Sequence, residues 1–140
     1  MAHWLYKSEP FKWSWDQQVK AGAKGTHWDG VRNHAAKLNL MRMKTGERGF
    51  FYHSNEGKEI VGIAKVTQRA YQDPTTDDDR WVVVDLAPVK PLAEPVGLDR
   101  IKKDEALREI PLVTHSRLSV MPIAKPAFER ILKLGKTRAR

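Results

Sequence analysis

The feature that most constrains this fold is a succession of short β-prone runs broken by glycine, proline and polar clusters. Residues 4–7, 49–53, 60–66 and 81–86 each have the length and apolar content of a strand. A turn cluster at residues 54–58 predicts a hairpin between the second and third runs. The connections are too irregular for repeated strand–helix–strand units, so a doubly wound parallel sheet fits poorly.

Two helices are predicted in the first half of the chain. Ser14 suits the N-cap of a short helix over residues 15–20, because its hydroxyl can accept from a free backbone N–H. Residues 33–43 have helical spacing, whereas the glycine-interrupted residues 28–32 predict a loop. In the second helix we expect one shared face, made by Ala35, Leu38 and Met41.

In the second half of the chain the sequence predicts a strand, two helices and a closing strand. An amphipathic helix is expected over residues 98–109, and a last helix over residues 126–134 begins with a proline suited to its first turn. Residues 112–113 and 118–120 suggest a closing strand with a polar interruption. The prolines that we expect to break the chain after the strand at residues 81–86 are Pro88, Pro91 and Pro95.

These elements together predict an α+β fold, a small β-barrel of about five or six strands with peripheral short helices. The 140 residues fit a single domain over 1–140. A chain of this length buries about two thirds of its unfolded surface, so one core is feasible. Residues 135–140 read as a basic C-terminal tail.

The charge is compatible with a polyanionic partner, and equally with a basic protein that has none, and the composition fits a reducing compartment. The formal net charge is +8, and a polyanion is attracted to such a chain because binding releases counterions. The absence of cysteine excludes disulfides, thiolate zinc sites and a cysteine nucleophile. No stretch approaches the roughly 20 apolar residues that span a bilayer, so we expect no membrane partner and a cytoplasmic protein.

Aromatic side chains gather near polar ones in the predicted loops. Trp13, Trp15 and Trp28 lie in or beside loops, near Ser8 and Asn33. A flat aromatic face beside hydroxyl and amide groups suits a planar heterocycle such as an unpaired base. The alternative is that these indoles belong to the core, which is where we place the two tryptophans of the strand patterns, Trp4 and Trp81.

Catalytic and metal-binding motifs find little support. No Gly-x-Ser-x-Gly elbow occurs, and His53–Ser54 and His115–Ser116 are adjacent pairs whose side chains would point to opposite faces of a strand. His27 and His34 have no third ligand at a metal-binding spacing. The acidic run at residues 77–79 reads as a solvated turn. We therefore expect no enzyme, no metal and no cofactor.

Six segments resemble the EVE domain in the same order along nearly the whole chain. They are residues 4–10 (WLYKSEP), 28–33 (WDGVRN), 51–54 (FYHS), 60–64 (IVGIA), 70–74 (AYQDP) and 116–122 (SRLSVMP). The resemblance implies a PUA-like barrel, related in shape to the YTH and ASCH domains. It also implies a pocket for a modified base, such as a modified cytosine or adenine, in DNA or RNA.

The resemblance also assigns expected roles to individual residues. Trp28 would be the stacking wall, with Trp13 or Trp15 as a second wall. Asp29 could instead form an internal ion pair with Arg32. The residues expected to hydrogen-bond the base or shape the pocket are Ser8, Asn33 and Ser54. Those expected to hold phosphate or brace the pocket loops are Arg32 and Arg117.

Two other classes of function remain open. An enzyme acting on a nucleobase would need an acid or base over the pocket, for which Glu9, Asp29 and His53 are the candidates. A general RNA-binding or protein-interaction module would use the basic tail instead. The oligomeric state is not predicted.

Overall fold

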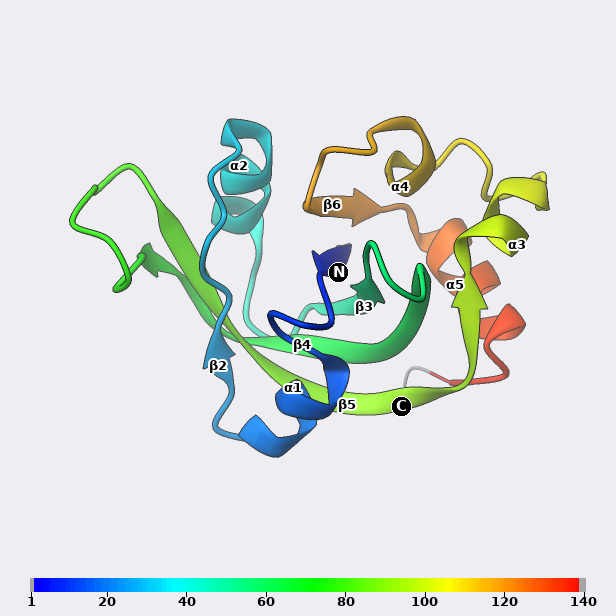
Figure 1. Cartoon of the computed structure of the whole chain (residues 1–140), viewed down its shortest axis with the longest axis horizontal. Coiled ribbons are helices and arrows are strands. Elements are labelled where there is room, and N and C mark those ends of the chain that lie inside the picture. The colour runs from blue at the N-terminus through cyan, green and yellow to red at the C-terminus, as the bar shows by residue number, and fades with distance from the viewer. Residues whose placement is uncertain (1, 139–140) are drawn as a thin grey trace.

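The computed structural model describes residues 2–138, whose strands form one curved sheet with helices around it (Figure 1). The strands are β1 (His3–Ser8), β2 (Thr26–His27), β3 (Arg48–His53), β4 (Glu59–Gln72), β5 (Val82–Gly97) and β6 (Val120–Ile123). The helices are α1 (Trp15–Ala21), α2 (His34–Arg42), α3 (Leu98–Lys103), α4 (Pro111–Thr114) and α5 (Lys125–Leu134).

The sheet has six strands in the order β2-β5-β4-β3-β1-β6. β1 lies between β3, which runs parallel to it, and β6, which runs antiparallel, and the remaining pairs are antiparallel. β4 and β5 curve strongly (Figure 1), yet within residues 2–138 the edge strands β2 and β6 do not pair with each other. The α+β class and the strand number are confirmed, and the barrel is an open one.

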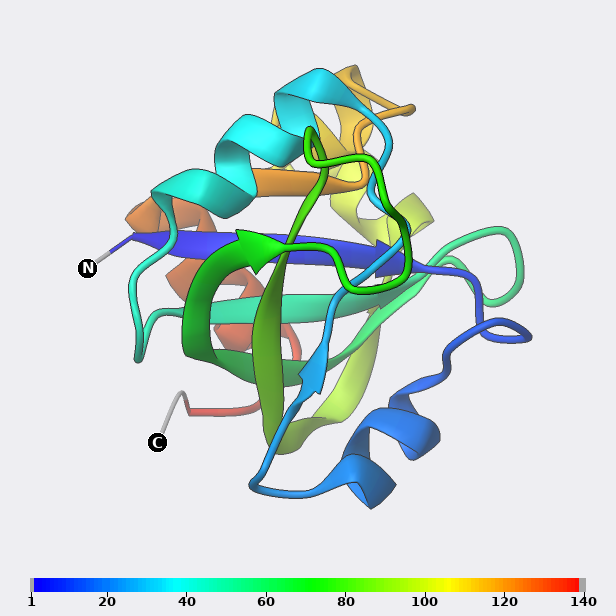
Figure 2. The same ribbon diagram turned by 90° about the vertical axis from the view of Figure 1, so that its left-hand side faces the viewer.

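Two apolar clusters form on opposite faces of the sheet because side chains alternate along each strand. In β1, Trp4 and Tyr6 enter one cluster, whereas Leu5 enters the other. Phe51 joins the cluster of the two β1 aromatics, and its neighbour Phe50 joins that of Leu5. The first cluster is covered by α1 and α2, and the second by α3, α4 and α5 (Figure 2).

The N-terminal helix and the first hairpin are confirmed. Ser14 caps α1 and forms a capping box with Gln17, because each side chain accepts from the other residue's backbone N–H. The turn between β3 and β4 contains Asn55, Gly57 and Lys58 in the left-handed region, with φ of 65°, 81° and 46°. This turn lies beside the one after β1, because the Asn55 amide donates to the Glu9 carboxylate at 2.6 Å and the Ser54 N–H donates to the Ser8 carbonyl at 2.9 Å.

The predicted face of α2 is wrong. Ala35, Leu38 and Met41 lie on the exposed side of the helix. The residues that pack on the sheet are Ala36, Asn39, Leu40 and Met43. Asn39 is the polar residue that interrupts this apolar stripe in the sequence. It can be buried because its side-chain amide donates to the Val120 carbonyl at 2.7 Å.

The three prolines do not end β5, contrary to our expectation. β5 continues through Pro88, Pro91 and Pro95 to Gly97. β2 pairs with β5 only at Asp85 and Leu86. The rest of the β5 edge that faces β2 therefore needs no backbone N–H donors, and proline, which has none, is tolerated there. On the other side the ladder with β4 contains register shifts, which absorb residues that cannot donate.

Three further expectations in the second half are corrected. α3 ends at Lys103, and the following Asp104 instead accepts from Arg130 of α5 at 2.8 Å. The segment expected to start the closing strand is the short helix α4, with Pro111 in its first turn. Trp81 is only half-buried, and the cations of Arg32, Lys37 and Arg80 lie over its ring at 5.5–5.9 Å.

The start of the basic tail is attached to β5. The Thr137 hydroxyl accepts from the Ala93 N–H at 2.7 Å, and Lys136 pairs with Glu94 at 3.0 Å. Residues 139–140 of the predicted tail lie outside the described residues. Among residues 2–138, no helix has both the length and the apolar character needed to cross a bilayer.

Candidate functional site

A hollow of about 680 Å³ opens beside the end of β1. Its walls come from the turn after β1, the loop after β2, the β3–β4 turn and the segment that precedes β6. Ordinary ligand pockets measure about 300–1,000 Å³, so this hollow has room for a small molecule. Two indoles, those of Trp13 and Trp28, lie in its lining.

Trp28 is a rigid wall of the hollow. It is 7% exposed, with its ring 5.5 Å from those of Tyr6 and Phe51, the latter in an edge-on arrangement at 88°. Its backbone N–H donates to the Val84 carbonyl at 2.8 Å. The indole therefore packs on the core along most of its surface and still borders the hollow.

Trp13 is positioned by hydrogen bonds at both ends of the residue. Its indole N–H donates to the Gln18 side chain at 2.9 Å, and the buried Gln18 amide donates in turn to the Leu86 carbonyl at 3.0 Å. The Ser8 hydroxyl donates to the Trp13 carbonyl at 2.6 Å. Trp13 is thus held to α1, β5 and β1 at once.

Trp15 lies away from the hollow. It is 7% exposed, contacts Phe51 edge-on, and covers the Cα of Gly62 so closely that a Cβ there would meet its ring at 2.5 Å. Of the two candidates for a second wall, only Trp13 borders the hollow.

The rim of the hollow combines hydroxyls with charges of both signs. Four hydroxyl side chains line it: Ser8, Thr26, Ser54 and Ser119. The lining cations are Lys7, Lys12 and Arg117, and the lining acids are Glu9 and Asp29. Glu9 is already engaged, since it accepts from Asn55 at 2.6 Å and pairs with Lys12 at 3.4 Å. Arg117 is exposed and has no ion-pair partner among residues 2–138.

Lys7 connects the hollow to the segment before β6. Its ammonium group donates to the Ser116 carbonyl at 2.7 Å, and its backbone N–H donates to the Ser119 carbonyl at 2.8 Å. Burial lowers the pKa of Lys7 from its ordinary value. These bonds fix the segment that carries Arg117 against β1.

Two of the expected site residues have structural partners outside this hollow. The Asn33 side chain accepts from the Ala36 N–H at 2.9 Å and caps α2. Arg32 pairs with Asp73 at 3.1 Å rather than with Asp29, so that expected pair is wrong. Asp29 instead lies 3.1 Å from His27 Nε2.

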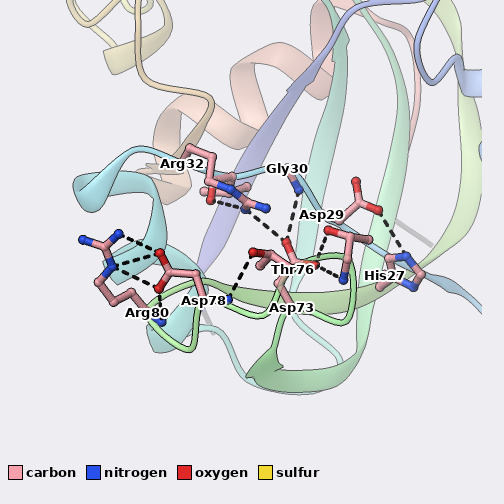
Figure 3. Close-up of polar contacts among 10 residues, drawn as sticks. His27, Asp29, Gly30, Arg32, Asp73, Thr76, Asp78 and Arg80 are labelled. Carbon is pink, nitrogen blue, oxygen red and sulfur yellow. Dashed lines mark hydrogen bonds and ion pairs between the residues drawn. The ribbon is translucent and has the colours of Figure 1, made fainter.

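Asp73 anchors the loop that carries Trp28 (Figure 3). Its carboxylate is fully buried and accepts from the Gly30 N–H, from Arg32, and from the N–H and hydroxyl of Thr75. Burial alone would raise the pKa of Asp73, but these hydrogen bonds outweigh it and hold the pKa below its ordinary value. The only sequence signal for Asp73 was its place in the fifth resembling segment.

The model of the EVE domain matches residues 2–134. The chain belongs to the EVE domain family. Human thymocyte nuclear protein 1 is 33% identical to this EVE domain over 95% of the chain and 73% of the human protein.

Solved structures agree with this assignment. The protein Atu2648 from Agrobacterium tumefaciens is 42% identical, with a TM-score of 0.97 over 100% of this chain and 97% of its own. Human THYN1 in complex with DNA that contains 5-methylcytosine is 30% identical, with a TM-score of 0.89 over 99% of both chains. A Zygosaccharomyces rouxii YTH domain, 18% identical with a TM-score of 0.59 over 98% of this chain and 88% of its own, shares the fold.

His53 does not reach the hollow of this EVE domain. Its Nε2 atom accepts from the Trp15 N–H at 3.1 Å, and burial lowers the pKa of the ring, which favours the neutral form that this hydrogen bond requires. The adjacent Ser54 lines the hollow, as expected for neighbours that point to opposite sides. Among residues 2–138, no group of three or more histidine, aspartate or glutamate side chains could hold a metal ion.

Proposed function

We propose that this EVE domain binds a modified nucleobase, carried by DNA or RNA, in the hollow between Trp13 and Trp28. The observation that carries the proposal is an indole packed on the core, Trp28, that borders an open hollow lined by hydroxyl groups. Stacking of a base on an aromatic side chain contributes about 1–3 kcal/mol. Because both indoles are held by the core or by hydrogen bonds, the ligand would meet a preorganised surface.

The comparison with the human relative supports the class of ligand. Human THYN1 shares the fold over 99% of both chains and has been crystallised with DNA that contains 5-methylcytosine. Because that relative forms a complex with DNA that contains a modified cytosine, a modified base is the natural first ligand to test here. Modified DNA and modified RNA are the two alternatives for this chain, and titration separates them.

The charges around the hollow suit a strand backbone. Arg117 and Lys12 are exposed cations in the lining, and the whole chain carries a formal charge of +8. Phosphate contacts of this kind supply affinity, whereas contacts with the base edge supply selectivity. The hydroxyls of Ser54 and Ser119 are the groups that we expect to read the base edge.

Binding without catalysis is the form of the proposal that the geometry favours. Of the three candidate catalytic groups, Glu9 is held by Asn55 and Lys12, and His53 is turned toward Trp15. Asp29, beside His27, is the remaining acid at the rim. Turnover of a modified nucleoside that disappears in Asp29→Asn while binding remains would contradict this part of the proposal.

The test is titration of the protein with matched oligonucleotides that differ only in one base modification. Trp28→Phe keeps an aromatic ring against Tyr6 and Phe51 but reduces the stacking face, so we expect about a fivefold loss of affinity for the preferred modified strand. Trp81→Phe is the matched control, since Trp81 lies outside the hollow. Equal affinity for every modification, with salt-sensitive binding only, would contradict the proposal.

A general nucleic-acid or protein-interaction module is the second candidate, favoured by the basic charge. Replacing Lys136 and Arg138 by glutamine would weaken such a module strongly but a base-reading pocket only slightly.

The cytoplasmic location stays a prediction, and the name of the human relative places that protein in the nucleus.

A further inference from the structure

A second, smaller hollow adjoins the first across one side chain. It measures about 340 Å³ and lies between the start of α2 and the segment that precedes β6. Its lining comprises Asn33, Ala35, His115, Ser116, Arg117 and Leu118. Arg117 belongs to the lining of both hollows.

We propose that the second hollow binds the nucleotide next to the modified base in the same strand, with Arg117 at the phosphate that joins the two. The inference rests on the proposed function, because the first hollow must hold the base. With both hollows occupied, the protein would recognise two successive nucleotides. Its affinity would then depend on the nucleotide that flanks the modified one.

The charge of the second hollow fits a polyanionic chain. None of its lining residues is acidic, whereas the first hollow has two lining acids. Arg117 has no acidic partner among residues 2–138, so its guanidinium group can bind a phosphate in the bidentate geometry that arginine favours. His115 uses Nδ1 for a hydrogen bond with Thr114 at 2.8 Å, which leaves Nε2 for a ligand.

The chemistry of the remaining lining suits a nucleoside. Ala35 and Leu118 supply apolar surface on which a sugar or base can lie. Ser116 supplies a hydroxyl group. Apolar surface with a few polar groups is the usual composition of a ligand site.

The two walls of the second hollow are held at a fixed separation. The Asn39 amide of α2 donates to the Val120 carbonyl of β6 at 2.7 Å, which ties one wall to the other. Lys7 donates to the Ser116 carbonyl at 2.7 Å, and the Leu118 N–H donates to the His115 carbonyl at 3.0 Å. The subsite is therefore present before any ligand binds.

Ala35→Glu is the variant that tests the subsite. Position 35 is exposed in the first turn of α2, where a carboxylate stabilises a helix, so the fold should hold. The added carboxylate would pair with Arg117 and repel a phosphate. Ala35→Gln matches it in size without charge, and Ala106→Glu makes the same change of net charge at an exposed position that lines neither hollow.

Two ligands are titrated into each variant: a modified nucleoside, and a short single strand that carries the same base with a neighbour on each side. For Ala35→Glu we expect about a threefold or greater loss of affinity for the strand, unchanged affinity for the nucleoside, and a salt dependence shallower by about 0.7 in slope. Ala106→Glu should bind both ligands as the unaltered protein does. Equal weakening of strand binding by both glutamate variants, or none by Ala35→Glu, would overturn the subsite.

Amide NMR signals separate a failure of this inference from a failure of the proposed function. Strand binding should shift the signals of Ala35 and His115 in the unaltered protein, whether or not the base is modified. If those signals shift but the modification has no effect on affinity, recognition of a modified base fails, and only the contact of a strand with the second hollow stands. If modification matters but the Ala35 and His115 signals do not move, the subsite fails and the proposed function stands.

Discussion

The guanidinium group of Arg32 lies 3.1 Å from the carboxylate of Asp73, and the two differ sharply in exposure. The Arg32 side chain is 41% exposed, whereas that of Asp73 is fully buried. A buried carboxylate is stable only when its oxygens accept several hydrogen bonds. Here the bonds come from both loops, so the pair joins the loop that carries Trp28 to the loop between β4 and β5 (Figure 3).

Replacing Asp73 by asparagine should destabilise the protein. The amide keeps the shape but loses the charge and one acceptor, so donors from Gly30, Arg32 and Thr75 are left under-satisfied. We expect a loss of about 1–3 kcal/mol in the free energy of unfolding, measured by urea denaturation. Faster hydrogen exchange of the Gly30 amide should accompany it. Unchanged stability and exchange would show that the loop is held by other contacts.

His53 should make stability depend on pH in a defined window. Burial lowers its pKa in the folded protein, with Glu59 and Asp16 opposing the shift, whereas an unfolded histidine titrates near 6.5. Above pH 6.5 the His53 ring is neutral in both the folded and the unfolded state, so its full contribution to the free energy of unfolding is present. As the pH falls through 6.5 the unfolded state binds the proton first, so stability declines until the folded pKa is reached.

The measurement for His53 is an NMR titration of its ring together with urea unfolding at pH 7 and pH 5. His53→Gln keeps an acceptor for the Trp15 N–H and removes the titration, so its stability should change less between the two pH values. His3, whose pKa burial also lowers, is present in both proteins and cancels in the comparison. A His53 pKa at or above 6.5 would contradict the expectation.

Local rules of sequence predicted the elements whose signals lie within a few residues. The Ser14 cap, the turn with Asn55 and Gly57, and the N-terminal proline of α5 each depend on backbone geometry that neighbours determine. Elements that depend on distant partners were missed. β5 continues through three prolines because of how β2 and β4 pair with it, and no local pattern contains that information.

The lining of the hollow includes several residues named from the sequence, whereas the residues that support them were not foreseen. Trp13, Trp28, Ser8, Ser54 and Arg117 meet at one hollow although they come from four segments. Their convergence followed from the resemblance to a family, since no spacing rule connects them. The support from Asp73 could not be inferred, because a lone aspartate in a polar loop reads as exposed until the fold buries it.

Gly62 should resist substitution because Trp15 covers it. A Cβ at this position would lie 2.5 Å from the indole ring, and that ring is itself packed on Phe51. Gly62→Ala should therefore lower the free energy of unfolding by about 1–3 kcal/mol. Gly97→Ala is the control, since nothing lies within 4 Å of its Cβ position. Its effect should stay within about 1 kcal/mol, and equal losses in the two variants would refute the packing argument.

Ser8 and Ser54 both line the hollow, but they should respond differently to removal of the hydroxyl group. The Ser8 hydroxyl donates to the Trp13 carbonyl at 2.6 Å, so Ser8→Ala should cost about 0.5–1.5 kcal/mol of stability and loosen one aromatic wall. Within residues 2–138 the Ser54 hydroxyl has no hydrogen-bond partner, so Ser54→Ala should leave the unfolding midpoint unchanged.

Ligand titration of the same pair separates positioning from direct contact. Ser8→Ala should weaken binding of a modified strand together with stability, because it acts through Trp13. Ser54→Ala should weaken binding alone, since a buried base edge would lose a hydrogen-bond partner, and the loss should be smaller for an unmodified strand. If Ser54→Ala binds both strands as the unaltered protein does, its hydroxyl does not contact the base, and selectivity must come from the other lining groups.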